Sequence, residues 1–386
     1  MRLLYKAVLF ICTGTLLISL YFPNRSTASQ MNVSAHSAIL MDETTGRVMY
    51  EVNAHEKSRI ASITKIMTAL LAIESGQLDE TVTVSGNAFG TEGSSLFLKE
   101  GQKIKLEDLV YGLMLRSGND AAVAIAEKVG GSVDGFVWMM NEKAKEIGMK
   151  NSHFSNPHGL DNTKDHYSTA YDMALLTKYA MQNETYAKIA GTKVHRAPNS
   201  TEDWDYVWKN KNKLLTQLYE YCTGGKTGYT KLAKRTLVTT ATKGDLDLIA
   251  VTLNGPDDWN DHINMYEAAY KSYDSVEIVG TGDLKGIKQK TYKNKTYIKN
   301  AFVYPLTKKE KKKVKVDIKL LKPKKEWKDP EQIPEVVGKA YFYLDGKKIG
   351  ARSIFYGEAR ESSGRISSFA SWFDLFKKVL GMSPNG

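Results

Sequence analysis

The sequence predicts an α+β fold, with mixed helices and strands over 29–274 and a small β-rich domain over 275–358. Before Tyr273, segments with apolar residues at helical spacing alternate with β-rich segments. After it come short segments rich in Thr, Tyr, Ile and Val, with many lysines that we interpret as a solvated face. Mixed and purely β segments in succession are typical of separate domains in an α+β chain. A length of 386 residues also favours two domains.

The first 28 residues predict a secretory signal peptide. Arg2 and Lys6 precede an apolar run over 7–22, and small residues lead to a cleavage point after Ala28. The run is short for a membrane span, which needs about 20 residues, so an uncleaved anchor is the weaker alternative. After cleavage only Cys222 remains of the two cysteines, so stability must come from an ordinary core and not from an intrachain disulfide.

The elements of the mixed region follow from hydrophobic spacing and turn residues. A hairpin is expected at 37–42 and 47–53 around the turn Glu43-Thr44-Thr45-Gly46, and a strand at 81–84. The expected helices are 62–74, with Ile66, Leu70 and Ile73 on one stripe, then 106–115, 120–129, 136–147 and 169–181. From Cys222 the chain changes to strands, with 236–242 and 246–253 around a turn at 243–245. A helix over 262–273 should cover that sheet.

The C-terminal segment 359–386 predicts a linker and an amphipathic helix on a membrane surface. Phe369, Trp372, Phe373, Phe376, Val379 and Leu380 recur at helical steps, whereas Lys377 and Lys378 lie on the opposite face. Such a helix lies in the membrane interface with its rings immersed; docking on the protein's own core is the alternative. The net charge of +11 suits an anionic partner such as a membrane or wall polymer. Nucleic acid is excluded because the signal peptide directs the chain out of the cytoplasm.

Ser62-Ile63-Thr64-Lys65 is the single S-x-x-K of the chain and begins the expected helix 62–74. Residues three apart share a helix face, so the Lys65 amine can reach the Ser62 hydroxyl. A serine needs an adjacent base to act as a nucleophile, and lysine can serve when burial and nearby cations lower its pKa. Free N–H groups at the helix start favour developing negative charge. An exposed pair on a surface helix is the alternative.

The triplet Ser-Gly-Asn occurs twice, at 85–87 and at 117–119. Ser117-Gly118-Asn119 lies in a short break between two expected helices, where a buried turn can direct a hydroxyl and an amide into a cleft. Ser85 follows an alternating strand and precedes glycine-rich sequence, which favours a surface turn. We therefore select 117–119 as the functional triplet.

Lys226-Thr227-Gly228 lies in an expected strand and is the single K-T-G of the chain. Alternation along a strand sends Lys226 and Gly228 to one face, so a cation stands beside a position without a side chain. This suits a cleft wall along which a substrate backbone lies while Lys226 attracts a carboxylate. An ordinary lysine at a strand end is the alternative.

S-x-x-K, S-x-N and K-T-G in this order are the motif set of penicillin-binding proteins and class A β-lactamases. The surrounding segments 61–69, 112–122 and 225–230 resemble serine D-alanyl-D-alanine carboxypeptidases, the low-molecular-mass penicillin-binding proteins, as do 154–160 and 168–172. The resemblance is close over 36–275 and covers the β-rich domain and the tail only in layout. It implies a β-lactamase-like or penicillin-binding-protein-like catalytic domain, an antiparallel sheet flanked by helices.

The resemblance also implies a role for each matched residue. Ser62 attacks the carbonyl between the two terminal D-alanines of a peptidoglycan stem peptide, with Lys65 as general base. Ser117 relays a proton to the leaving amine and Asn119 orients the substrate amide. The substrate-binding residues are Lys226, Thr227, Gly228, Tyr229 and Thr230, with the backbone N–H groups of Ser62 and Tyr229 as the oxyanion hole. β-Lactams are expected as acylating inhibitors, and no cofactor or metal is implied.

Other readings of the same motifs remain open. A class A β-lactamase needs a deacylating glutamate in an E-x-x-L-N motif, which this chain lacks. Endopeptidase or transpeptidase activity would use the same acyl-enzyme, and a non-catalytic wall-binding protein is disfavoured because all key residues are present. His158 is expected to be structural, since the chain has no H-E-x-x-H or other zinc signature.

One local departure concerns the residues before Lys226. Many family members carry Asp-Gly there, whereas this chain reads Tyr221-Cys222-Thr223-Gly224-Gly225. This run resembles the sporulation-associated branch of the family, which acts on spore cortex at the forespore membrane. Cys222 has the strand parity of Lys226 and would then face the cleft, although we expect a packing role for its thiol.

Overall fold

The structure, a computed structural model, describes residues 32–327 and 329–358. The predicted signal peptide, 1–28, and the predicted C-terminal helix within 359–386 lie outside the described residues. Among the residues that are described, none of the helices is both long enough and apolar enough to cross a membrane.

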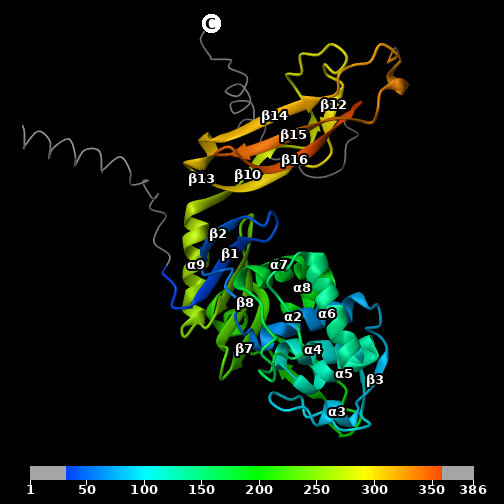
Figure 1. The fold of residues 1–386 in the computed structure, drawn as a ribbon, viewed down its shortest axis with the longest axis vertical. Helices are drawn as coiled ribbons and strands as arrows, with labels where there is room; N and C mark the ends of the chain where they lie inside the picture. The colour runs from blue at the N-terminus through cyan, green and yellow to red at the C-terminus, as the bar shows by residue number, and fades with distance from the viewer. Residues whose placement is uncertain (1–31, 328, 359–386) are drawn as a thin grey trace, which may run out of the picture. The chain divides into compact units, whose positions relative to one another are not determined.

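The first half of the fold is built on a five-stranded antiparallel sheet with the order β2-β1-β9-β8-β7. Its strands are β1 Ser37–Asp42, β2 Val48–Val52, β7 Cys222–Thr230, β8 Lys234–Lys243 and β9 Leu246–Leu253. Helix α9, Asp258–Ser272, packs on one face against β8 and β9, and the other helices gather on the opposite face (Figure 1). The sheet therefore ends in β7, and this edge strand carries the K-T-G motif.

The helices on this side are α2 Lys65–Glu74, α3 Gly86–Phe89, α4 Leu106–Arg116, α5 Asn119–Gly130, α6 Val133–Ile147, α7 Ala170–Met181 and α8 Glu184–Ala190. Those that the hydrophobic spacing predicts are present, with ends that differ by a few residues, whereas α3 and α8 were not expected from the sequence. The sequence predicted that α2 buries a single apolar stripe. The buried surface is wider than that, because every residue from Lys65 to Ile73 is buried. A helix that is enclosed all round belongs to the core, so Lys65 lies inside the protein.

Two short hairpins extend the helical side of the molecule. β3 Thr81–Thr83 pairs with β4 Lys103–Lys105, and β5 Val194–Ala197 pairs with β6 Tyr206–Lys209. The second hairpin was not expected from the sequence, because its long connection, 198–205, is polar and gives no turn signature of a tight hairpin.

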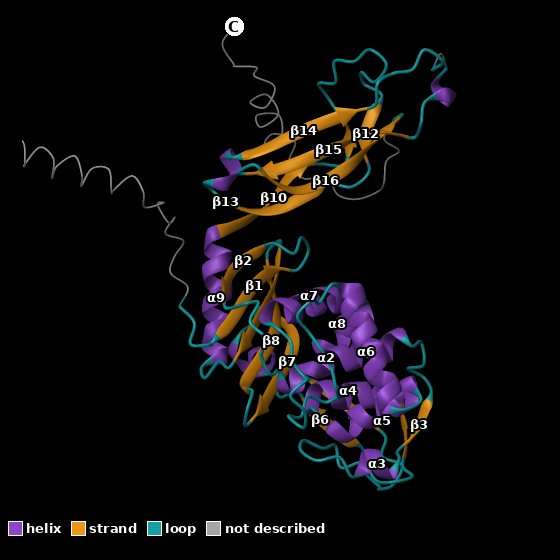
Figure 2. Ribbon diagram, in the orientation of Figure 1, coloured by secondary structure: helices purple, strands orange, loops and turns teal. Residues whose placement is uncertain are grey.

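In the second half, the regular elements of the described residues are strands and two short 3₁₀ turns (Figure 2). A five-stranded sheet has the order β11-β12-β16-β15-β14, and β10 pairs with β13. The strands are β10 Tyr273–Val279, β11 Gly282–Asp283, β12 Thr296–Ile298, β13 Phe302–Thr307, β14 Val314–Leu320, β15 Val336–Leu344 and β16 Lys347–Tyr356. They enclose a core of their own that includes Tyr292, Phe302 and Phe342. The predicted α+β class is confirmed, whereas the exact domain boundaries stay a prediction.

Candidate active site

Ser62 lies in a 3₁₀ turn, Ala61–Thr64, that leads directly into α2. The turn opens at Ala61 with a φ of 49°, a left-handed conformation that is strained for a residue with a side chain. The β8 residue Thr236 helps to hold this geometry, since its hydroxyl donates to the Ile60 carbonyl at 3.0 Å. Ser62 is half-buried while its neighbours are buried, so its hydroxyl is reachable from outside.

The Lys65 amine is enclosed by three oxygen atoms from three separate segments. Its Nζ lies 3.0 Å from Ser62 Oγ and donates to Asn119 Oδ1 and to the His158 carbonyl, both at 2.7 Å. A neutral amine has two N–H donors and one lone pair. With the amide and carbonyl oxygens occupying the two donors, the lone pair is left for the serine hydroxyl.

The electrostatics of this pocket favour the neutral amine. Burial lowers the pKa of Lys65 well below its usual value, and the positive charges of Lys226 and Lys211 act in the same direction. Asp120 opposes them but does not outweigh burial. Desolvation and neighbouring cations are the two effects that convert a lysine into a base near neutral pH.

The Ser117-Gly118-Asn119 turn joins α4 to α5 beside this amine. The Asn119 amide is oriented by its Nδ2, which donates to the Glu92 carbonyl at 2.6 Å and thereby turns Oδ1 toward Lys65. Ser117 has a φ of 67° in the left-handed region. Among the described residues, its hydroxyl is one of three buried side-chain oxygens without a hydrogen-bond partner. Such an orphaned group in a strained turn calls for a functional explanation.

The duplicate triplet lies elsewhere and has a structural task. Ser85 caps α3, because its Oγ accepts from the Ala88 N–H at 3.0 Å and donates to Glu127 at 2.6 Å. Its neighbour Asn87 also donates to Glu127, at 2.8 Å. The structure thus brings 117–119, and not 85–87, next to Lys65.

The K-T-G motif lies on β7 beside the serine turn. A Cβ added to Gly228 would stand 2.9 Å from the Ser62 backbone nitrogen and 2.4 Å from Thr236 Oγ1. Only glycine therefore lets β7 approach the nucleophile this closely. Lys226 is buried and donates to the Thr227 carbonyl at 2.8 Å. Burial, followed by the charge of Lys211, lowers the pKa of Lys226 to about 7.

The last two predicted binding residues follow on the same strand. Tyr229 is exposed, with 64% of its surface accessible. Thr230 Oγ1 accepts from the Ala233 N–H at 2.9 Å in the turn that joins β7 to β8. Thr230 therefore shapes the strand end, and its hydroxyl hydrogen remains available.

Lys211 belongs to the site although the sequence did not single it out. Its backbone N–H donates to the Leu115 carbonyl at 3.1 Å, which fixes the segment beside the end of α4. Its charge lowers the pKa of both Lys65 and Lys226, and partial desolvation together with the charge of Arg116 lowers its own pKa. Lys211 lies in a polar run without a recognisable motif, so no sequence signal was available for it.

Asp120 is a second residue that sequence reasoning missed. Its carboxylate accepts from the backbone N–H groups of Leu96 and Leu98 and from the Ser95 hydroxyl. The neighbouring Asn119 N–H donates to the Ser94 carbonyl at 2.7 Å. These contacts attach the loop before β4 to the start of α5, so the loop becomes a fixed wall of the site.

The two histidines near the cluster are neutral and structural. Burial lowers the pKa of His158 to about 3, and its carbonyl is used to accept from Lys65. Burial lowers the pKa of His166 to about 4; its Nδ1 accepts from the Ser155 N–H and its Nε2 contacts Thr64 Oγ1. His158 thus contributes a backbone oxygen and not its ring to the amine.

The expectation that Cys222 shares the face of Lys226 is wrong. A β-bulge interrupts the pairing between Cys222 and Gly224, so Cys222 pairs with Ala241 whereas Lys226 pairs with Val238. Positions 238 and 241 point to opposite faces of β8. Burial raises the pKa of the Cys222 thiol to about 11, which makes it a poor nucleophile.

The arrangement can carry out acyl transfer on a substrate that bears a carboxylate. It offers a hydroxyl, a buried neutral amine at 3.0 Å, an unpartnered second hydroxyl and two further lysines. Within the described ranges, no carboxylate hydrogen-bonds to Ser62 or Lys65, and no cluster of His, Cys, Asp and Glu has the form of a metal site.

Comparison with known families gives two matches that together span most of the chain. Residues 24–257 match the D-alanyl-D-alanine carboxypeptidase family. Residues 273–362 match the C-terminal domain of penicillin-binding protein 5.

Curated relatives carry the same description. The chain is 32% identical to the D-alanyl-D-alanine carboxypeptidase DacC of Escherichia coli, over 94% of this chain and 97% of that protein. It is 38% identical to the D-alanyl-D-alanine carboxypeptidase DacF of Bacillus subtilis, over 64% of this chain and 65% of that protein. The alignment with DacF thus spans slightly less than two thirds of its length.

Solved structures agree with the fold. Penicillin-binding protein 5 of Haemophilus influenzae superposes with a TM-score of 0.69 at 27% identity, covering 85% of this chain and 97% of that one. Penicillin-binding protein 6B of Escherichia coli gives a TM-score of 0.66 at 28% identity, with 86% and 98% covered. The chain therefore belongs to the serine D-alanyl-D-alanine carboxypeptidases, the low-molecular-mass penicillin-binding proteins.

Proposed function

We propose that this protein removes the terminal D-alanine from peptidoglycan stem pentapeptides through an acyl-enzyme on Ser62. The observation that carries the proposal is the contact of 3.0 Å between Ser62 Oγ and the buried amine of Lys65. Both N–H donors of the neutral amine are occupied, one by Asn119 Oδ1 and the other by the His158 carbonyl. The lysine is therefore held with its lone pair toward the hydroxyl, as a general base requires.

In the first step, Ser62 Oγ attacks the carbonyl carbon between the terminal D-alanines and Lys65 takes the hydroxyl proton. The negative carbonyl oxygen lies at the backbone N–H groups of Ser62 and Tyr229. The close approach of Gly228 to the Ser62 nitrogen supports this pairing of segments. Loss of one such donor typically costs about 2.7–4 kcal/mol of transition-state stabilisation.

In the second step, the C–N bond breaks and D-alanine leaves as an amine. Ser117 gives its hydroxyl proton to the leaving nitrogen and receives the proton that Lys65 took from Ser62, which gives the unpartnered hydroxyl a purpose. The carboxylate of the leaving residue is held by Lys226 and Thr227, with Lys211 as a further cation. Water then hydrolyses the ester on Ser62 and regenerates the hydroxyl.

β-Lactams should acylate the same serine. A class A β-lactamase needs a carboxylate to activate the deacylating water, and the described residues place none in hydrogen-bond contact with Ser62 or Lys65. We therefore expect a long-lived penicilloyl-enzyme. A wall-binding role without catalysis would not require the strained turns at Ala61 and Ser117.

Transfer of the acyl group to an amine in place of water is the second candidate. The chain covers 97% of the structurally similar DD-transpeptidase of Streptomyces K15, at 30% identity and a TM-score of 0.58. Endopeptidase activity on a cross-link would use the same acyl-enzyme.

The deciding experiment compares wild type with Ser62→Ala on a pentapeptide that ends in D-Ala-D-Ala. Wild type should release D-alanine and form a stable covalent adduct with labelled penicillin, and Ser62→Ala should do neither. Ser85→Ala is the matched control and should keep both activities. No release by a folded wild type would reject the carboxypeptidase, and release by Ser62→Ala would reject the nucleophile. An added amine acceptor detects transpeptidation in the same assay.

We also propose where the reaction takes place. Cleavage of the signal peptide after Ala28 would export a mature chain with a catalytic domain over 29–274 and a β-rich domain over 275–358. The amphipathic segment within 359–386 would then hold it peripherally at the outer face of the cytoplasmic membrane. A role at the forespore membrane is supported by the run 221–225 and by the similarity to DacF.

A further inference from the structure

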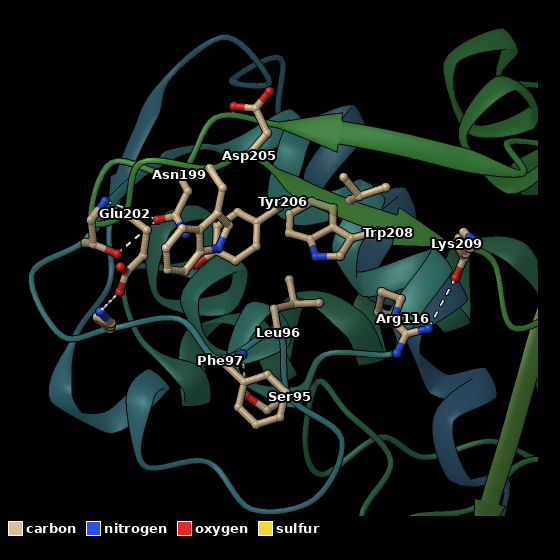
Figure 3. A pocket seen from close by; sticks show the side chains of 14 residues that line it. Ser95, Leu96, Phe97, Arg116, Asn199, Glu202, Asp205, Tyr206, Trp208 and Lys209 are labelled. Carbon is tan, nitrogen blue, oxygen red and sulfur yellow. Dashed lines mark hydrogen bonds and ion pairs between the residues drawn. The ribbon is translucent and has the colours of Figure 1, made fainter.

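A groove of about 700 Å³ lies beside the catalytic cluster, and the reaction described above makes no use of it. One wall is the loop that contains Ser95, Leu96 and Phe97, and the other is the β5–β6 hairpin. Figure 3 shows Leu96 and Phe97 on one side of the groove and the rings of Tyr206 and Trp208 on the other.

Two segments link the groove to the catalytic site. Arg116, which lines the groove, directly precedes Ser117. The loop wall is attached to the site because Asn119 N–H donates to the Ser94 carbonyl and Asp120 accepts from the Leu96 N–H. The groove is therefore built on segments that neighbour the catalytic residues, where a further part of a long substrate would lie.

Two aromatic side chains of the groove are largely exposed to solvent. Phe97 is 83% exposed and Trp204 is 64% exposed, although burial of such rings is normally favourable. Phe97 has a φ of 63°, a strained value for a bulky residue, and the Asp120 contacts on either side of it hold it there. A strained, exposed ring in a fixed loop is a feature that marks a binding surface.

The base of the groove is rigid. Trp208 is almost fully buried and stacks on Tyr206 with ring centroids 5.1 Å apart. The Tyr206 hydroxyl is fixed by the Gln102 side-chain amide at 3.1 Å. Rigid aromatic surfaces bind a flat apolar ligand face with little loss of conformational entropy.

The charges of the groove nearly cancel. Lys99, Arg116 and Lys209 are offset by Glu202 and Asp205, and Lys99 forms an ion pair with Glu202. A stem peptide with its free carboxylates would favour a strongly basic groove. A neutral ring with an apolar face and polar edges fits stacked aromatics and a balanced polar rim better.

We propose that this groove binds an N-acetylated hexosamine ring of the glycan strand whose stem peptide occupies the catalytic cleft, an inference that rests on the proposed function. Phe97 and Trp204 contact the apolar face of the sugar. The rim polar groups, including Asn199 and Arg116, bind its hydroxyl and acetamide groups. The enzyme thereby distinguishes a stem peptide on its glycan from a free peptide.

The test measures kcat/KM for a free pentapeptide and for the same pentapeptide on its disaccharide. Wild type should prefer the disaccharide substrate. Trp204→Ala and Phe97→Ala should lose that preference by about tenfold, through KM, while the free pentapeptide and penicillin acylation stay unchanged. Trp138→Ala removes an equally exposed ring (66%) on α6, outside the groove, and should behave as wild type.

Equal loss on both substrates would assign the groove to the stem peptide, and no loss on either would leave it without a substrate; both results overturn the proposal. A second measurement titrates peptide-free glycan strands into the full-length Ser62→Ala protein, with and without Trp204→Ala. Binding that requires Trp204 supports the sugar site even if D-alanine release fails. Release of D-alanine without glycan binding overturns the sugar site and leaves the proposed function intact.

Discussion

Lys65 and Lys226 are both buried, but the proposed reaction needs them in opposite protonation states. Lys65 must be neutral to accept a proton, so activity should rise with pH through its lowered pKa. Lys226 must be charged to hold a carboxylate, and its pKa in the free enzyme is about 7. Above that pH the cation is lost, so kcat/KM should fall. A pH profile of kcat/KM measures both limbs.

The profile of kcat should differ from that of kcat/KM on the alkaline side. A bound carboxylate favours the charged lysine and raises its pKa, so the alkaline limb of kcat should lie at higher pH. A substrate with a C-terminal carboxamide lacks that charge and serves as the control, because it should show no alkaline limb from Lys226. If both substrates gave the same alkaline limb, that limb would belong to a group other than Lys226.

Ser117 and Ser85 form a natural pair for mutation, since each begins a Ser-Gly-Asn triplet. Ser117→Ala should lower the rate of D-alanine release by about 10²-fold or more, the usual contribution of a proton-transfer group. Ser85→Ala should keep that rate and lower the free energy of unfolding by about 0.5–2 kcal/mol, because it removes a helix cap. Steady-state rates of D-alanine release and denaturant unfolding curves of both variants test these two expectations. Equal rates in the two variants would contradict a relay by Ser117.

At the residue scale, the sequence was informative where a motif fixes spacing. Ser62 and Lys65 are three apart on the way into one helix, so their proximity follows from local geometry alone. Lys211 reaches the cluster through tertiary packing, as a backbone hydrogen bond to Leu115 shows. No local pattern encodes such a contact, and so it could not be predicted.

At the scale of elements, the contact between β7 and the serine turn depends on one glycine. Gly228→Ala would place a Cβ 2.4 Å from Thr236 Oγ1 and 2.9 Å from the Ser62 nitrogen, so the strand and the turn must separate. Acylation by penicillin should fall by about 10²–10³-fold, as when an oxyanion-hole donor is lost. Stopped-flow acylation measures this directly.

Gly90→Ala is the matched control for that variant. Its added Cβ would meet only the Gly86 carbonyl at an ordinary 3.4 Å, at the end of α3. Its acylation rate should equal that of wild type. Wild-type acylation by a folded Gly228→Ala protein would show that the close approach is unnecessary.

Long periodic helices and the main paired strands were predictable from the sequence. The β-bulge near Cys222 and the β5–β6 hairpin were not. The bulge between Cys222 and Gly224 reverses the face of Cys222, and strand parity alone cannot reveal an extra residue. The β5–β6 hairpin has a long polar connection, so its strands carried no turn signal. Both features lie close to the site, where regular geometry is most often interrupted.

At the scale of the whole molecule, the described residues bury apolar side chains in the helix-and-sheet half and, as a separate cluster, in the β-rich half. The change after Tyr273 from mixed segments to purely β-rich segments predicted this division, because each half has its own hydrophobic pattern. The sequence gives no comparable account of how the β-rich half contributes, since it carries no catalytic motif.

The proposed attachment to a membrane is tested on the full chain. Removal of residues 366–386 from the mature protein should release it into the soluble fraction, because the predicted helix supplies the apolar face that enters the interface. D-alanine release from a soluble pentapeptide should be unchanged. Fractionation of membranes that contain either form checks the prediction, and retention of the shortened form would contradict it.

The position of β7 at the end of its sheet also bears on solubility. In the described part of the chain β7 pairs with β8 alone, so its outer backbone groups can pair with any extended chain, including another copy of the protein. Three of its nine residues are glycine and one is lysine, a composition that disfavours promiscuous strand pairing. The glycines of this strand, one of which lets it approach the serine turn, therefore also limit aggregation, and β-branched residues in their place would promote it.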